Sequence, residues 1–283
     1  MSVSPLVDAE WLAANLDRAD IIVLDASWYL PAAGRNADQE FEKGHIPGAQ
    51  RFDFDRDVAD RETDLPHMLP PPAQFEDAAR RLGISGDSLV VCYDGAGIFA
   101  APRAWWMFKA MGHDRVVVLD GGMPAWRAAG GKEEAGPAKS RHRGSFVALP
   151  NGARLRNAQQ VQAGLNDGST LVVDARPPAR FKGEEPEPRA GLRSGHMPGA
   201  SNVPFGSLLS SGRYLRRDQL AEILRAAGVS ADRPIVASCG SGVTAAVVAL
   251  GVEAAGFAPA AVYDGSWAEW GRQDSGLPVV QGQ

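Results

Sequence analysis

The chain contains two copies of one sequence pattern, and this repeat restricts its fold more than any other feature. Gly44–Ala49 reads Gly-His-Ile-Pro-Gly-Ala, and Gly195–Ala200 reads Gly-His-Met-Pro-Gly-Ala. Three further pairs of segments recur in the same order at a similar spacing of roughly 150 residues: 21–26 with 171–176, 89–94 with 234–239, and 118–122 with 262–266. A period of this length indicates two tandem modules related by duplication.

Each copy alternates short apolar runs with longer helical patterns. Residues 21–26 and 171–176 are β-branched runs of the kind that forms buried strands. Apolar residues recur at spacings of three and four along 72–82, 101–111, 217–227 and 243–255, which predicts helices. Alternating strands and helices predict an α/β protein in which each module is a parallel sheet flanked by helices.

The length of the chain supports two domains. At 283 residues it exceeds the usual size of one compact domain, and each half is long enough to bury its own core. Residues 130–151 are rich in Gly, Ala, Lys and Arg, include Pro137 and Pro150, and show no sustained period. We therefore predict a first domain at 1–139, a linker at 140–152 and a second domain at 153–283.

Composition excludes several classes of protein. A net charge of -5 with 22% charged residues gives no reason to expect a nucleic-acid partner. The two cysteines, Cys92 and Cys239, are too few and too far apart for a disulfide framework or a Cys-rich zinc site, and they favour a reducing compartment. The N-terminal sequence lacks the pattern of a signal or transit peptide, and no apolar stretch is long enough to span a bilayer. We predict a cytoplasmic protein without membrane association.

The most reactive residue in the sequence is expected to be Cys239. It follows the apolar run 235–238, where ligands gather in open parallel sheets, and it precedes a predicted helix. Gly240 and Gly242 allow the backbone to fold tightly, so that several N–H groups and the positive end of the helix can face the sulfur. These donors favour the thiolate, which is the nucleophilic form, and they would equally stabilise a persulfide anion.

A buried structural cysteine is the alternative, and Cys239 alone does not separate the two interpretations. The glycine-lined loop favours the nucleophile, because a core cysteine has no need of such a loop. Cys92 lacks this context and is predicted to be inert. The first module has Asp94 at the position of Cys239, and a carboxylate cannot carry sulfur. The first module is therefore predicted to be non-catalytic and the second to be catalytic.

The cysteine loop carries a resemblance to a known family. The segment Cys239–Ala245, Cys-Gly-Ser-Gly-Val-Thr-Ala, looks like the loop of the tandem-domain 3-mercaptopyruvate sulfurtransferases of the rhodanese superfamily. Thiosulfate:cyanide sulfurtransferases typically carry Arg and Lys where this chain has Gly240 and Ser241. The resemblance covers essentially the whole chain and implies two rhodanese-like domains. It also implies that the following loop residues bind substrate: Gly240, Gly242, Val243 and Thr244.

A second matching segment, Arg180–Arg189, is similar to the family segment whose two arginines bind the carboxylate and keto group of the substrate. The resemblance assigns these roles to Arg180 and Arg189. A guanidinium is a permanent charge with a planar fork that fits a carboxylate, so two of them suit an α-keto acid. For either arginine taken alone, a solvated surface position would be the favoured interpretation.

The resemblance also implies a proton relay. Asp55 and His67 resemble first-domain residues that are proposed in relatives to act with the loop serine, here Ser241. Asp55 departs by one residue from the expected local spacing. A relay would handle the proton that must be moved when the pyruvate enolate leaves. The alternative is that His67 only lines the domain interface.

The expected function is transfer of sulfane sulfur from 3-mercaptopyruvate, through a Cys239 persulfide, to cyanide, a small thiol or a thioredoxin-like dithiol protein. No metal or organic cofactor is expected. Two alternatives stay open: a thiosulfate-preferring rhodanese and a non-enzymatic sulfur carrier. A cysteine phosphatase of this fold is disfavoured, because Ala245 stands where phosphatases carry the phosphate-binding arginine.

Overall fold

The computed structural model describes residues 4–282, which form two compact units. The N-terminal unit comprises 4–61, Leu69–Asn151 and Ser211–Tyr214. The C-terminal unit comprises Glu62–Met68, Gly152–Ser210 and 215–282. Glu62–Met68, from the first half of the chain, thus belongs to the C-terminal unit. Ser211–Tyr214, from the second half, belongs to the N-terminal unit.

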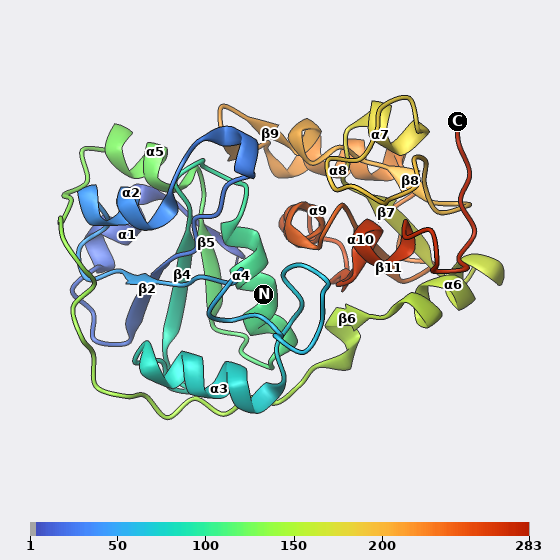
Figure 1. Cartoon of the computed structure of the whole chain (residues 1–283). Helices are drawn as coiled ribbons and strands as arrows, with labels where there is room; N and C mark the ends of the chain where they lie inside the picture. The colour runs from blue at the N-terminus through green and yellow to red at the C-terminus, as the bar shows by residue number, and fades with distance from the viewer. Residues whose placement is uncertain (1–3, 283) are drawn as a thin grey trace. The chain divides into compact units, whose positions relative to one another are not determined.

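The N-terminal unit is built on a sheet of five parallel strands in the order β1-β5-β4-β2-β3 (Figure 1). One face packs against α1, α2 and α5 through a core that includes Leu12, Phe41 and Trp126. The rings of Phe75 and Phe108, from α3 and α4, lie in contact on the other side. The strands are β1 (Leu6–Val7), β2 (Ile21–Asp25), β3 (Gln50–Arg51), β4 (Leu89–Tyr93) and β5 (Val116–Leu119), and the helices are α1 (Ala9–Asn15), α2 (Ala37–Lys43), α3 (Pro72–Arg81), α4 (Ala101–Ala110) and α5 (Gly122–Ala128), with the short η1 (Pro31–Ala33).

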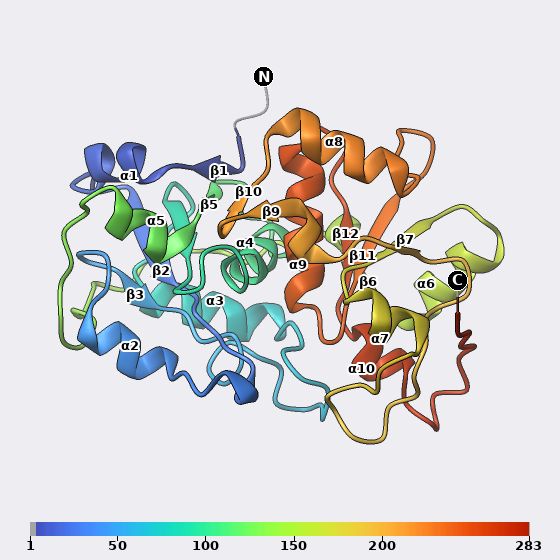
Figure 2. The ribbon, with the colours of Figure 1, turned by 90° about the horizontal axis from the view of Figure 1, so that it is seen from above.

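The C-terminal unit repeats this arrangement with the sheet order β6-β12-β11-β7-β8, again all parallel. Its apolar core includes Val161, Trp267 and Trp270, from α6 and α10. On the sheet, α9 contacts β11 and β12 (Figure 2). The elements are β6 (Leu155–Arg156), β7 (Leu171–Asp174), β8 (Ser201–Asn202), β9 (Leu209–Ser210), β11 (Ile235–Ser238), β12 (Ala261–Tyr263), α6 (Ala158–Asn166), α7 (Pro178–Lys182), α8 (Arg217–Ala226), α9 (Val243–Ala254), α10 (Ser266–Trp270), η2 (Gly152–Arg154) and η3 (Phe205–Leu208), while β10 (Arg213–Tyr214) belongs to the N-terminal unit.

The predicted α/β class with two parallel sheets flanked by helices is confirmed. The four predicted helices α3, α4, α8 and α9 begin at the expected residues and end one residue earlier. Six shorter helices, of five to nine residues, were not predicted, because one or two turns give too little periodicity to recognise. In addition, α4 and α9 are buried on nearly all sides rather than on one face.

The segment 130–151 contains no helix or strand in the described structure, yet it is bound closely to the N-terminal unit. Phe146 is buried, and its N–H donates to the carbonyl of Ile84 at 3.1 Å. Gly144 lies so close to the backbone of Ile84 that any side chain would overlap it. The segment is therefore held in place by backbone contacts rather than by secondary structure.

The two histidines of the repeated Gly-His motif occupy equivalent places. His45 Nδ1 lies 2.8 Å from the carbonyl oxygen of Phe41 and stacks on the Phe41 ring. His196 Nδ1 lies 2.8 Å from the carbonyl oxygen of Phe181 and stacks in the same way. Each histidine thus joins a loop to the end of a short helix, which is a structural function.

Candidate active site

The two sheets present equivalent loops at the carboxyl ends of their central strands. Ser238, the last residue of β11, pairs with Asp174 of β7, and Cys239 follows. Tyr93, the last residue of β4, pairs with Asp25 of β2, and Asp94 follows. The strand registers therefore place Cys239 and Asp94 at the same point of the repeated module. Cys239 is only 2% exposed.

The backbone of the cysteine loop is tied to the start of α10. The carbonyl oxygens of Cys239 and Gly240 accept N–H groups of Trp267 and Ala268, both at 2.9 Å. Gly242 has a φ of 78°, which glycine adopts without strain, and it is the residue from which α9 starts. The first N–H groups of a helix have no partner within it, so the start of α9, with Val243 buried and Thr244 half-buried, presents donors and a positive dipole to the loop.

The N-terminal unit shows what such a loop can hold. The carboxylate of Asp94 accepts four backbone N–H groups, from Ala96 at 2.9 Å, Phe99 at 3.0 Å, and Ala100 and Ala101 at 2.8 Å. Burial raises the pKa of Asp94, and these four hydrogen bonds offset only part of that effect. An acidic group thus occupies, in one module, the place that a cysteine sulfur occupies in the other.

The structure brings the two predicted arginines to the cysteine loop. A Cβ atom built on Gly240 would lie 3.4 Å from Arg180 Nη2 and 3.8 Å from Arg189 Nη1. Both guanidinium groups therefore border the residue next to Cys239. Gly240 and Ser241 add no charge of their own, so Arg180 and Arg189 are the positive groups that adjoin the loop at this point.

Arg180 is held in place by a buried network that the sequence did not reveal. Arg180 Nη2 lies 2.5 Å from Glu187 Oε2, and Arg176 Nη1 lies 2.7 Å from Glu187 Oε1. Arg176 also pairs with Asp174 at 2.7 Å and stacks over the Trp267 ring. Burial lowers the pKa of Arg176, but the carboxylates of Asp174 and Glu187 outweigh it and raise the pKa above its ordinary value. Glu187 thereby fixes the orientation of Arg180.

Ser266 is a second residue that sequence reasoning missed. It is fully buried with a φ of 49°, a left-handed conformation that is uncommon outside glycine. Its Oγ accepts the N–H of Cys239 at 3.2 Å and donates to the Tyr263 carbonyl at 2.8 Å. The other module has Gly122, with a φ of 52°, at this position. A serine at the position where the repeat has glycine is the sequence signal that could have pointed to this residue.

The predicted relay residues are distributed over both units. His67 belongs to the C-terminal unit, is 3% exposed, and has its Nε2 3.5 Å from Arg189 Nη2. Ser241 is buried in the same unit. Asp55 is exposed in the N-terminal unit, where its N–H donates to Asp53 Oδ1 at 2.9 Å. These positions leave the relay as a prediction.

The other cysteine has a different environment. Cys92 is fully buried in the middle of a sheet, and burial raises the pKa of its thiol. Neither Cys92 nor Cys239 forms a disulfide.

Among residues 4–282, no group of three or more His, Cys, Asp or Glu side chains is arranged to hold a metal ion. In the same part of the chain no helix is long and apolar enough to cross a membrane.

Comparison with known proteins shows which family has this sequence and this fold. The model of the rhodanese-like domain matches residues 8–129 and 157–273. The chain is 42% identical to the 3-mercaptopyruvate sulfurtransferase of Escherichia coli K12 over 99% of each protein. It is 40% identical to the thiosulfate/3-mercaptopyruvate sulfurtransferase 1 of Arabidopsis thaliana, named as mitochondrial, over 97% of this chain and 78% of the relative. The crystal structure of Escherichia coli SseA, a 3-mercaptopyruvate sulfotransferase, superposes with a TM-score of 0.85 and 40% identity, covering 94% of this chain and all of SseA.

The chain therefore belongs to the rhodanese family and, within it, to the thiosulfate/3-mercaptopyruvate sulfurtransferases. The predicted family and the prediction of a sulfur-transferring enzyme are confirmed. The names of these relatives include both thiosulfate and 3-mercaptopyruvate as donors, so overall similarity does not choose between the two. The choice of donor must be argued from the residues of the site.

Proposed function

We propose that this enzyme takes sulfane sulfur from 3-mercaptopyruvate onto Cys239 and passes it to a thiophilic acceptor. The observation that carries this proposal is the position of two guanidinium groups, those of Arg180 and Arg189, beside an uncharged Gly-Ser loop. Two arginines can bind the carboxylate and the keto oxygen of one α-keto acid. The thiol sulfur of that substrate is then held close to Cys239.

The proposed reaction has two half-reactions. The Cys239 thiolate attacks the sulfur of 3-mercaptopyruvate, a sulfur–sulfur bond forms, and the carbon–sulfur bond breaks with its electron pair passing to the pyruvate enolate. The enolate takes up a proton and leaves as pyruvate, and Cys239 is left as a persulfide. A thiol or cyanide then attacks the outer sulfur and releases the Cys239 thiolate.

A thiosulfate-preferring enzyme is the second candidate. Thiosulfate is a compact dianion, and binding it next to the sulfur would be favoured by cations in the loop itself. Gly240 and Ser241 supply no such cation.

The division into domains is also a proposal. We propose that residues 1–139 form a non-catalytic domain, because Asp94 replaces the cysteine there. The catalytic domain at 153–283 then follows a linker at 140–152.

For proton transfer we propose the relay Asp55, His67 and Ser241. Its support in the structure is the burial of His67 and Ser241 in the C-terminal unit and the approach of His67 Nε2 to Arg189. Asp55 rests on the family resemblance alone. His67→Asn should change the pH profile of kcat with 3-mercaptopyruvate, and an unaltered profile would remove His67 from the relay.

For the compartment we propose the cytoplasm. Both cysteines are free thiols, which suits a reducing environment. The Arabidopsis relative is named as mitochondrial, so close relatives do not all share one location. Fractionation of cells that produce the native chain would decide the matter, and recovery in an organelle would refute the proposal.

The test of the donor is a comparison of kcat/KM for 3-mercaptopyruvate and thiosulfate with the purified wild-type protein. We expect 3-mercaptopyruvate to be preferred by at least about tenfold, because the two arginines match its carboxylate and its keto group. Release of pyruvate from 3-mercaptopyruvate without any protein donor separates the enzyme from a passive sulfur carrier. Equal or higher kcat/KM with thiosulfate would refute the proposed donor.

The loop itself can be tested by Gly240→Arg combined with Ser241→Lys. Two added cations beside the sulfur should move the ratio of the two kcat/KM values toward thiosulfate by about tenfold. Gly240→Gln with Ser241→Gln is the matched control, since it adds similar bulk without charge. An unchanged ratio, or the same change in the control, would contradict the role given to loop charge.

A further inference from the structure

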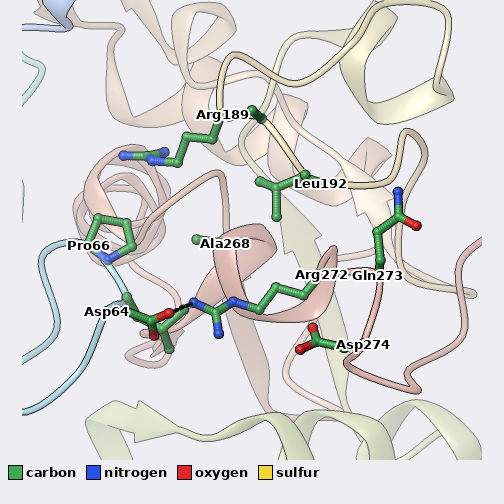
Figure 3. A pocket seen from close by; sticks show the side chains of 11 residues that line it. Asp64, Pro66, Arg189, Leu192, Ala268, Arg272, Gln273 and Asp274 are labelled. Carbon is green, nitrogen blue, oxygen red and sulfur yellow. Dashed lines mark hydrogen bonds and ion pairs between the residues drawn. The ribbon is translucent and has the colours of Figure 1, made fainter.

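A cavity of about 340 Å³ adjoins the cysteine loop within the C-terminal unit. Two of its lining residues also contact the loop. Ala268 donates its N–H to the Gly240 carbonyl, and the guanidinium of Arg189 borders Gly240. Arg272 lines the opposite side, and Figure 3 shows Arg189 and Arg272 extending over the cavity with Ala268 between them. The cavity therefore lies beside the cysteine loop, with Arg189 and Ala268 between the two.

The lining of this cavity combines apolar walls with both signs of charge. Leu65, Pro66 and Leu192 supply apolar surface, and Arg272 lies on the same side as two carboxylates, those of Asp64 and Asp274. Apolar walls with a few convergent polar groups and a volume of a few hundred cubic ångströms are typical of sites for small organic molecules. Arg189, to which the proposed donor binds, is one of the lining residues, and because pyruvate leaves before the acceptor binds, donor and acceptor can use this space in turn.

The Arg272 guanidinium is available for exchange. It pairs with Asp64 at 2.6 Å, but the two side chains are 36% and 77% exposed. Ion pairs this exposed contribute little to stability, so the carboxylate of a ligand can take the place of Asp64. Asp274, which is also exposed, lies in the same lining and can pair with a cationic group.

We propose that this cavity is the acceptor pocket and that it receives a small zwitterionic thiol of the amino-acid type, with its carboxylate on Arg272 and its ammonium group on Asp274. This inference rests on the proposed function. The acceptor thiolate attacks the outer sulfur of the Cys239 persulfide, a new sulfur–sulfur bond forms, and the bond to Cys239 breaks with its electron pair returning to the Cys239 thiolate. The acceptor leaves as a persulfide.

The test uses four acceptor thiols that share a two-carbon spacing: cysteine, 3-mercaptopropionate, cysteamine and 2-mercaptoethanol. With saturating 3-mercaptopyruvate, Arg272→Gln should raise KM for the two carboxylate-bearing thiols by about fivefold relative to 2-mercaptoethanol, and leave cysteamine unchanged. Asp274→Asn should raise KM for cysteine and cysteamine and leave 3-mercaptopropionate unchanged. Only cysteine should respond to both substitutions.

Arg216→Gln is the matched control, because Arg216 is an exposed arginine of the same unit that pairs with Asp218. It should leave all four KM values unchanged. Equal shifts for all four thiols would overturn the acceptor pocket, and so would a fivefold rise in the donor KM with Arg272→Gln, since that would place the donor there. Intact mass after donor treatment is measured in parallel. A persulfide on each variant without selectivity among thiols refutes only the pocket, whereas absence of a persulfide on the wild type refutes the proposed function as well.

Discussion

The Asp94 loop and the Cys239 loop occupy the same place in two copies of one module, and their difference explains why one copy is suited to chemistry. Asp94 accepts four backbone N–H groups within its own loop, so its carboxylate is fully engaged. Cys239 leads into a shorter loop, and α9 begins at Val243. Equivalent loops of the two units thus hold a hydrogen-bonded carboxylate in one case and the proposed sulfur carrier in the other.

The surroundings of the two loops differ in a second way. In the N-terminal unit a side chain on Gly95 would overlap the hydroxyl group of Tyr29, which donates to Glu40 at 2.7 Å, while Glu40 also pairs with Arg35. The group nearest to Gly95 is thus a tyrosine hydroxyl, and the paired Arg35 and Glu40 line a cavity of about 320 Å³ beside that loop. Beside Gly240 the nearest groups are instead the guanidiniums of Arg180 and Arg189, at ordinary contact distance. The two copies of the module thus share one sheet order and differ in the groups that lie beside this loop.

The largest effect is expected from the cysteine itself. Cys239→Ser should lower sulfur transfer by at least about a thousandfold, because the nucleophile is lost. Cys92→Ser should change the rate by less than about twofold, since Cys92 lies in the core away from the loop. Steady-state rates with 3-mercaptopyruvate check both expectations. Equal losses in the two variants would break the comparison.

The arginines allow a paired test of the two modules. Arg180→Ala should lower kcat/KM for 3-mercaptopyruvate by about a hundredfold, mainly through KM, because a charged contact to the substrate is removed. Arg35→Ala removes the arginine beside the Asp94 loop and should leave kcat/KM within about twofold. If Arg35→Ala lowered kcat/KM as much as Arg180→Ala, the N-terminal unit would have a role in catalysis beyond a structural one.

Ser266 tests how the loop backbone is positioned. Ser266→Ala should lower kcat/KM by about fivefold, because the N–H of Cys239 loses its acceptor. Ser266→Gly should be equally slow but should have the higher Tm, since glycine relieves a left-handed strain of about 1 kcal/mol. Thermal unfolding and steady-state kinetics measure the two effects separately. Wild-type activity in Ser266→Gly would show that the hydroxyl group is dispensable.

Asp94 gives the smallest expected effect, one on stability. Its pKa is raised in the folded state, so folding is favoured most below the ordinary pKa of about 4 and this contribution is lost as pH rises through the raised value. Asp94→Asn removes the titration, and the stability difference between wild type and variant should then shift against the wild type between pH 4 and pH 7. Urea unfolding at both values measures it, and a constant difference would contradict the assignment.

The sequence predicted the fold well because the repeat doubled every signal. Three strands of the first copy, β2, β4 and β5, had recognisable counterparts in β7, β11 and β12, and the first residues of α3, α4, α8 and α9 could be read from periodicity. The strands of only two residues were not predicted. The buried network around Glu187 was not predicted, since nothing in the local sequence says which carboxylate will face Arg180. The role of Ser266 depends on a backbone angle, and the contact between Asp64 and Arg272 joins residues 208 positions apart. Such features arise from tertiary packing and not from local pattern.

The central claim is that one residue of the duplicated pair, Cys239, carries the sulfur. The most direct measurement is intact mass, followed by peptide mapping, of the wild-type protein after treatment with 3-mercaptopyruvate and removal of excess donor. The account predicts one added sulfur per chain, located on the peptide that contains Cys239 and removed by cyanide. Added sulfur on Cys92, or none on Cys239, would contradict it.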